Sequence, residues 1–307
     1  MLLKSILLAG LGLLAASGTA FAADFSSILS PCAYSATNKA TLNANGLNLL
    51  QITQNDSDIQ VKGVAGLTQI NVVSKVCASS AGLLKTERIV TSRNGATATL
   101  ATQTDTHVYF SLPFGLERYA YMEIQVQVPD SLAVKTTSQS GDVSAQNLGT
   151  LTVQSDSGDI SAKQIHGLFT ASSSSGDIKA EDIGSVNLGD VESGDVVLSD
   201  IVGNVTINSL SSGDMNAQNV QGSITINAMS SGDLQLSNIQ HNVEVNTMGS
   251  GDVNISQIGG NVTLDNIGSG DVLANDIGGD FTVKNAADSD IHESNVKGTV
   301  SVPQSDD

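Results

Sequence analysis

Apolar and polar residues alternate in short, regularly spaced stretches over much of the chain. The stretches are spaced by the tripeptide Ser-Gly-Asp, which recurs eight times between Ser140 and Asp271 at intervals that lengthen from 17 to 19 residues. A ninth, degraded copy reads Asp288-Ser289-Asp290. A nearly constant period of this length, with one supersecondary unit per period, is typical of a solenoid.

Each copy begins with the pattern of a strand that has one buried face. The residue after the Asp is apolar in all nine copies, and the residue two further on is small or aliphatic in all but the last, where it is Glu293. A period of two residues indicates a β-strand. A second alternating stretch follows, for example at Val205-Thr206-Ile207 and Ile224-Thr225-Ile226.

No copy can bury its apolar side alone, so the copies are expected to stack at the inter-strand spacing of about 4.8 Å. A helical solenoid is disfavoured because Thr, Val, Ile, Asn and Gly dominate the repeats and form helices poorly. The sequence therefore predicts an all-β fold over residues 135–303. We expect a parallel β-helix (a β-solenoid), right-handed by the usual crossover preference.

The segments on either side of the repeats differ from them. Residues 23–134 lack the tripeptide but keep strand patterns, which predicts an N-terminal β region that caps the open edge of the solenoid. The polar tail at 304–307, which follows Pro303, is expected to stop strand addition.

Residues 1–22 have the three parts of a secretory signal. Lys4 supplies the positive charge, residues 6–16 form an apolar run, and Ala20-Phe21-Ala22 fits a cleavage site. The run is shorter than the roughly 20 residues that span a membrane, and no second apolar span follows. The sequence predicts export to the periplasm or surface of a bacterium, without a transmembrane segment.

Cys32 and Cys77 are the only cysteines in the chain. Two thiols in an oxidising compartment usually pair, so we predict a disulfide that acts as a structural staple. Five aromatic residues also gather in the N-terminal region. They are interpreted either as the core of the cap or as a surface that stacks on sugars. These residues are Tyr109, Phe110, Phe114, Tyr119 and Tyr121.

The net charge of −18 argues against nucleic acid and anionic membrane surfaces as partners. The Asp of each tripeptide would form a row of carboxylates, which either accept backbone hydrogen bonds or, as the alternative, bind calcium. The row comprises Asp142, Asp159, Asp177, Asp195, Asp214, Asp233, Asp252 and Asp271. Because these acids recur identically and no mixed acid and base cluster breaks the repeat, we predict no catalytic site and no cofactor.

The strand at residues 122–129, the following Ser131-Leu-Ala-Val-Lys-Thr-Thr137 and the repeated Ser-Gly-Asp-[Val/Ile] units resemble the bacterial putative-adhesin β-strand-repeat family, a domain of unknown function. The resemblance runs from about residue 40 to the end of the chain. It implies an exported parallel β-helical protein of the bacterial envelope, and no established chemistry.

The hypothesis is a non-enzymatic envelope protein, a structural or adhesin-like binding module whose partner is an unidentified envelope or surface protein or a glycan. The alternatives are a polysaccharide-active solenoid enzyme and a periplasmic regulatory partner.

Overall fold

The computed structural model describes residues 32–104 and 119–303, which form 24 strands and one short 3₁₀ helix. Residues 33–104 and 119–303 belong to one compact unit. The described residues contain no α-helix, so the all-β prediction is confirmed for them. None of their helices is long and apolar enough to cross a membrane.

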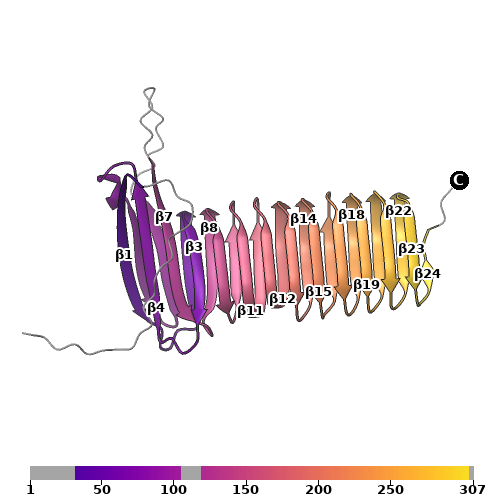
Figure 1. The fold of residues 1–307 in the computed structure, drawn as a ribbon, viewed down its shortest axis with the longest axis horizontal. Coiled ribbons are helices and arrows are strands. Elements are labelled where there is room, and N and C mark those ends of the chain that lie inside the picture. The colour runs from indigo at the N-terminus through magenta and orange to yellow at the C-terminus, as the bar shows by residue number, and fades with distance from the viewer. Residues whose placement is uncertain (1–31, 105–118, 304–307) are drawn as a thin grey trace, which may run out of the picture. The chain divides into compact units, whose positions relative to one another are not determined.

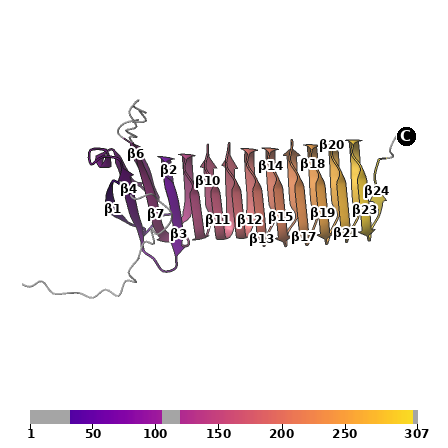
Figure 2. The same ribbon diagram turned by 45° about the horizontal axis from the view of Figure 1, so that its top comes forward.

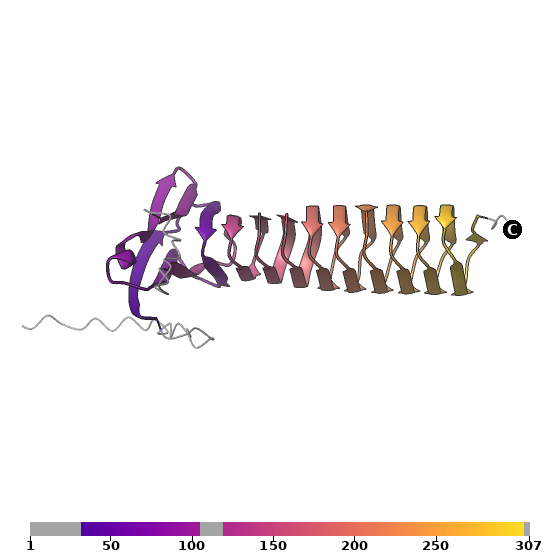
Figure 3. The same cartoon turned by 90° about the horizontal axis from the view of Figure 1, so that it is seen from above.

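The repeats fold into two columns of parallel strands, which Figure 3 shows as two rows. Column 1 contains the strand that follows each tripeptide: β9 (Val143–Leu148), the first parts of β11 (Ile160–Ser173) and β12 (Ile178–Ser193), β13 (Val196–Ile201), β15 (Met215–Val220), β17 (Leu234–Ile239), β19 (Val253–Ile258), β21 (Val272–Ile277) and β23 (Ile291–Val296). Column 2 contains β8 (Ala133–Ser140), β10 (Leu151–Ser155), the second parts of β11 and β12, β14 (Val205–Ser212), β16 (Ile224–Met229), β18 (Val243–Ser250), β20 (Val262–Ser269), β22 (Phe281–Asp288) and β24 (Val300–Ser301).

Each strand pairs in parallel with its equivalent in the next turn, and the register keeps equivalent residues together. Val196 pairs with Met215, for example, and Ile207 pairs with Ile226. The positions predicted to face inward are buried from Val143 to Val283 and form one continuous apolar core between the columns. The predicted parallel β-solenoid is therefore confirmed, and Figure 1 shows its strands side by side as far as β24.

The described N-terminal residues form strands that extend both columns: β1 (Tyr34–Asn43), β2 (Leu49–Asp56), β3 (Asp58–Val64), β4 (Gln69–Ala78), β5 (Glu87–Asn94), β6 (Thr97–Thr104) and β7 (Ala120–Pro129). The 3₁₀ helix η1 (Leu83–Lys85) lies between β4 and β5. In column 1, β7 pairs in parallel with β3 and antiparallel with β4, which in turn pairs antiparallel with β1. In column 2, β6 pairs in parallel with β2 and antiparallel with β5.

The order of these turns in space differs from their order in sequence. The turn made by β2 and β3 lies between the turn of β6 and β7 and the turn of β8 and β9 (Figure 2). The chain therefore passes from β7 to β8 over the turn of β2 and β3, whose residues precede their partners in β8 and β9 by 84 positions. Residues 84 apart become hydrogen-bonded neighbours, as Asp58 and Asp142 do.

One residue near the end of the column-1 stretch has an unusual backbone conformation in every repeat. The amide or acid that comes five residues after the last Asp of each copy has a positive φ of 52° to 59° in all nine repeats, from Asn147 to Asn295. Asn and Asp tolerate this left-handed conformation better than other non-glycine residues, which explains why they fill seven of the nine positions; Gln164 and Gln257 fill the other two.

Both cysteines of the chain, Cys32 and Cys77, are disulfide-bonded, so the predicted disulfide is present. Cys77 is buried in β4. The predicted signal sequence and the tail at 304–307 lie outside the described residues.

Candidate functional site

The Asp row is built by hydrogen bonds between turns. One oxygen of each Asp, Oδ1, accepts the backbone N–H of the Asp in the following turn, at N···O distances of 2.8 to 3.0 Å. The row begins at Asp58, whose Oδ1 accepts the N–H of Asp142, and continues to Asp271, which donates to Asp252. The carboxylates thus link each turn to the next by hydrogen bonds at the corner that precedes column 1.

A second row, made mostly of uncharged Asn side chains, links the turns by the same kind of hydrogen bond at the corner that precedes column 2. Oδ1 of Asn242 accepts the N–H of Asn261, and Oδ1 of Asn261 accepts the N–H of Asp280, both at 2.9 Å. Asn204 and Asp280 accept from Ser223 and Thr299 in the same way. The shared feature is therefore a side-chain oxygen that accepts a backbone N–H, and a charge is not needed for it.

Sequence reasoning identified the Asp row from Asp142 onward but missed its first member. Asp56-Ser57-Asp58 has the same form as the degraded copy Asp288-Ser289-Asp290 at the other end, and this match could have revealed it. Ser140 Oγ donates to Asp56 Oδ1 at 2.8 Å, which joins the two tripeptides further.

The described residues contain no preformed cluster of side chains that could bind calcium, the alternative role for the Asp row. No group of three or more His, Cys, Asp or Glu side chains converges there as a metal ion would require. In the Asp row one carboxylate oxygen of each member from Asp58 to Asp252 is already engaged by a backbone N–H. The row offers isolated carboxylates along a line, whereas calcium takes six to eight oxygen ligands at one point.

Charged pairs on the outer surface of the repeats also run between turns. Lys163 Nζ lies 2.7 Å from Glu181 Oε1, and Lys284 Nζ lies 2.7 Å from Asp265 Oδ1. The hydrogen bond and the charge of Glu181 raise the pKa of Lys163, and the same hydrogen bond and the Lys163 charge lower the pKa of Glu181. The side chains of Lys163 and Glu181 are both exposed, so this pair contributes little to stability, whereas Asp265 of the second pair is partly buried.

Two of the five aromatic residues can be placed. The rings of Tyr119 and Tyr121 are stacked, with centroids 6.1 Å apart and an interplanar angle of 26°. Burial, followed by the charges of Glu123 and Tyr119, raises the pKa of Tyr121. Tyr109, Phe110 and Phe114 lie outside the described residues. The sugar-stacking and core interpretations therefore both remain predictions.

Glu123 lies beside these tyrosines on β7. It pairs across the sheet with Lys75 of β4 and with Asp58 of β3. Partial burial raises the pKa of the Glu123 carboxyl, the charge of Lys75 lowers this pKa, and the charge of Asp58 raises it. The net effect is a pKa above the ordinary value for Glu. The raised pKa means that ionised Glu123 costs stability at neutral pH.

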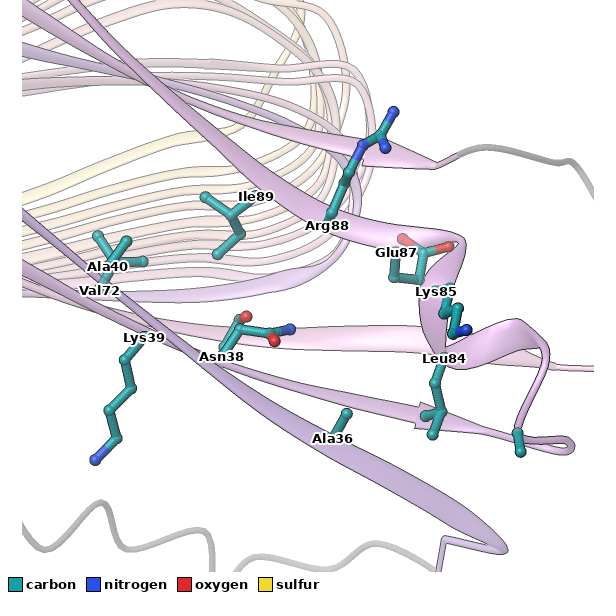
Figure 4. Close-up of a pocket in the computed structure, with 12 residues that line it drawn as sticks. Ala36, Asn38, Lys39, Ala40, Val72, Leu84, Lys85, Glu87, Arg88 and Ile89 are labelled. Carbon is teal, nitrogen blue, oxygen red and sulfur yellow. The ribbon is translucent and has the colours of Figure 1, made fainter.

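A pocket of about 570 Å³ lies at the N-terminal end of the core, between β1, β4, η1 and β5 (Figure 4). Apolar side chains line part of it, including Ala40, Val72 and Ile89. Ser74, Glu87 and three basic residues, Lys39, Lys85 and Arg88, line the rest. The sequence analysis did not find this pocket because its residues come from three separate segments that share no motif.

The Toastrack DUF4097 family matches residues 48–237. No curated protein matches the chain.

Several solved structures are similar to the chain at low sequence identity. They include a "putative lipid binding protein" from Parabacteroides distasonis (14% identity, 89% of this chain and 98% of that chain, TM-score 0.39). A "putative adhesin" from Bacteroides fragilis has 15% identity over 89% of this chain and 99% of that one, with a TM-score of 0.30. A "putative cell adhesion protein" from Clostridium sporogenes has 10% identity over 88% and 99%, with a TM-score of 0.26.

Proposed function

Because the chain belongs to the Toastrack DUF4097 family, we propose that it is a non-enzymatic binding or structural module that is exported to the bacterial envelope. In this proposal the partner is an envelope or surface protein or a glycan, and the contact is adhesin-like. The N-terminal signal pattern supports export.

The outer face of column 2 carries the proposal. One row of partly or fully exposed residues runs along this face from Thr152 to Thr282, with one residue in each turn. Six of its members are Thr, and the two exceptions are Asn187 and Glu244. A row of Asn side chains runs beside it, and Asn246 Nδ2 donates to Asn227 Oδ1 at 3.1 Å. The face presents the same hydrogen-bonding groups about every 4.8 Å, which suits a long, repetitive or extended partner.

The face can be tested by bulky substitutions that keep strand propensity. We expect Thr206→Tyr combined with Thr225→Tyr to reduce co-sedimentation of the purified protein with isolated envelope fractions. The matched control is Asn216→Tyr combined with Gln235→Tyr on the outer face of column 1, where both residues are exposed. Loss in the first pair alone supports the proposal. Equal binding by both pairs, or no co-sedimentation of the unmodified protein, contradicts it.

Export is tested separately by the intact mass of the protein recovered from the periplasm. The proposal expects a chain that begins near Ala23, whereas a cytoplasmic protein that retains Met1 would contradict it.

A further inference from the structure

The core opens at the N-terminal end of the two columns. In the described residues, β1 is the edge strand of column 1 at this end, and β5 is the edge strand of column 2. Residues of both strands line the pocket of about 570 Å³, together with Leu84 and Lys85 of η1 (Figure 4). Pockets that bind small molecules typically have volumes of about 300–1,000 Å³, mostly apolar walls and a few polar groups.

One part of the pocket is a continuation of the core. Ala40 and Ile89 are partly buried and pack against the core cluster, to which Val72 belongs with 2% exposure. Figure 4 shows these three side chains grouped at one side of the pocket. An apolar group placed there would extend the core by one further layer and would be removed from water.

The pocket also contains a buried hydroxyl without a partner. Ser74 is fully buried, and its Oγ has no hydrogen-bond partner among residues 32–104 and 119–303. It lines the pocket from β4, where it pairs with Asn38 of the adjacent strand β1. A buried hydroxyl without a partner is destabilising, so a ligand atom that accepts its hydrogen bond would gain from it.

The polar part of the pocket has more positive than negative side chains, although the chain as a whole carries a net charge of −18. Lys85 and Arg88 line it together with one carboxylate, that of Glu87, which is 7% exposed and already has an interaction partner. Arg88 Nε donates to Gln103 Oε1 at 3.0 Å. Lys85 makes no ion pair within the described residues. Lys39 also belongs to the lining, but its side chain runs away from the other labelled residues in Figure 4.

We propose that this pocket binds a small anionic amphiphile, a molecule with one apolar chain or ring and one carboxylate-like head. The apolar part lies between Ala40, Val72 and Ile89, and the head accepts hydrogen bonds from Lys85 and from the hydroxyl of Ser74. This site is independent of the outer face of column 2, so either proposal can fail without the other.

Isothermal titration of the purified protein with dodecanoate, below its micelle concentration, tests the proposal. We expect saturable one-to-one binding. Lys85→Gln should weaken binding about tenfold, because a charge-assisted hydrogen bond is lost. Lys62→Gln, at an exposed lysine of β3 that does not line the pocket, is the matched control and should leave the affinity unchanged. Ser74→Ala should also weaken binding.

A second pair of variants tests where the apolar chain lies. Ala40→Trp should fill the apolar part and reduce binding at least about tenfold. Val197→Trp, on the exposed face of β13, is its control and should have no effect. The melting transition of each variant, measured by circular dichroism, shows whether it is folded.

Three results would overturn the proposal. The first is the absence of saturable dodecanoate binding up to about 1 mM. The second is equal affinity for dodecyltrimethylammonium, which carries the same chain on a cationic head. The third is binding that a folded Ala40→Trp variant retains in full, because the ligand would then lie elsewhere.

Discussion

At the scale of single residues, the glycine of each Ser-Gly-Asp turn meets two separate requirements. Its φ lies between +99° and +123°, a region that residues with a side chain rarely adopt. The turns are also so close that a Cβ on Gly213 would lie 2.2 Å from the carbonyl oxygen of Gly194. A side chain would therefore be both strained and blocked at these eight positions, whereas Ser57 and Ser289 occupy the middle position in the two copies at the ends of the row, where φ is not positive.

Gly213→Ala should destabilise the protein by more than about 2 kcal/mol, since strained φ and a backbone clash add together. Gly66→Ala is the matched control, because Gly66 has a φ of +71° but nothing within 4 Å of its would-be Cβ. It should cost only about 1 kcal/mol. Urea unfolding of both variants measures the difference. Equal losses would show that the close approach between turns contributes nothing.

Glu123 gives a prediction about pH. Its folded-state pKa is raised, mainly by burial, so between its ordinary pKa and the raised value the folded state binds more protons than the unfolded state. This contribution to stability is present at low pH and is lost as the pH rises through the folded-state pKa. Glu123→Gln should therefore melt at a higher temperature than the unmodified protein at pH 7, and the difference should shrink in acid.

Exposed Glu244 provides the control for that experiment. Glu244→Gln should not reproduce the pH-dependent difference. A Glu123→Gln variant that melts lower at neutral pH would mean that its pairing with Lys75 outweighs the cost of burial.

The sequence predicted which residues face the core, because a period of two within a fixed repeat leaves little ambiguity. It did not predict that the Asp carboxylates bond to the next turn, since the partner of a side chain depends on the stacking register. Nor did it predict the left-handed φ at residues such as Asn147, although the recurring amide or acid marked the position.

At the scale of elements, the insertion of β2 and β3 between later turns could not be predicted. The N-terminal strands lack the tripeptide that would set their place in the stack, apart from Asp56-Ser57-Asp58. Hydrogen bonding across 84 residues is decided by the complementarity of whole turns, which local patterns do not contain. The pocket at the end of the core was missed for the same reason.

The last turn has a feature that blocks further stacking. Glu293 pairs in register with Ala274, so it occupies the row that is buried and small or aliphatic in earlier turns. Here it is exposed. An inward-pointing charge at a terminal strand is a known defence against edge-to-edge association.

Glu293→Leu should therefore promote association of the protein at its C-terminal end. Sedimentation velocity over a range of concentrations should show dimers or larger species that the unmodified protein does not form. Glu244→Leu adds the same apolar group on the outer face of β18, away from the end of the stack. This variant should sediment as the unmodified protein does, without dimers or larger species. Equal association of both variants would mean that Glu293 has no special role.

At the scale of the whole molecule, the Asp row is an electrostatic cost that the stack must offset. Carboxylates in adjacent turns, about 4.8 Å apart, repel by roughly 1 kcal/mol per pair in water. In the structure each bond from Oδ1 to the next turn's N–H supplies a compensating interaction. The Asn residues of the second corner make the same bond without the charge. We expect the Asp row to hold the turns together through these bonds, with calcium binding by the row as the alternative prediction.

Thermal unfolding of the whole protein in EDTA and in millimolar calcium tests this claim most directly, together with Asp233→Asn and Asp233→Ala. The claim predicts one melting temperature in both solutions. Asp233→Asn should cost little, because its amide oxygen still accepts the N–H of Asp252, and Asp233→Ala should cost about 1 kcal/mol. A melting temperature that calcium raises by many degrees, with the rise abolished in Asp233→Asn, would contradict the claim.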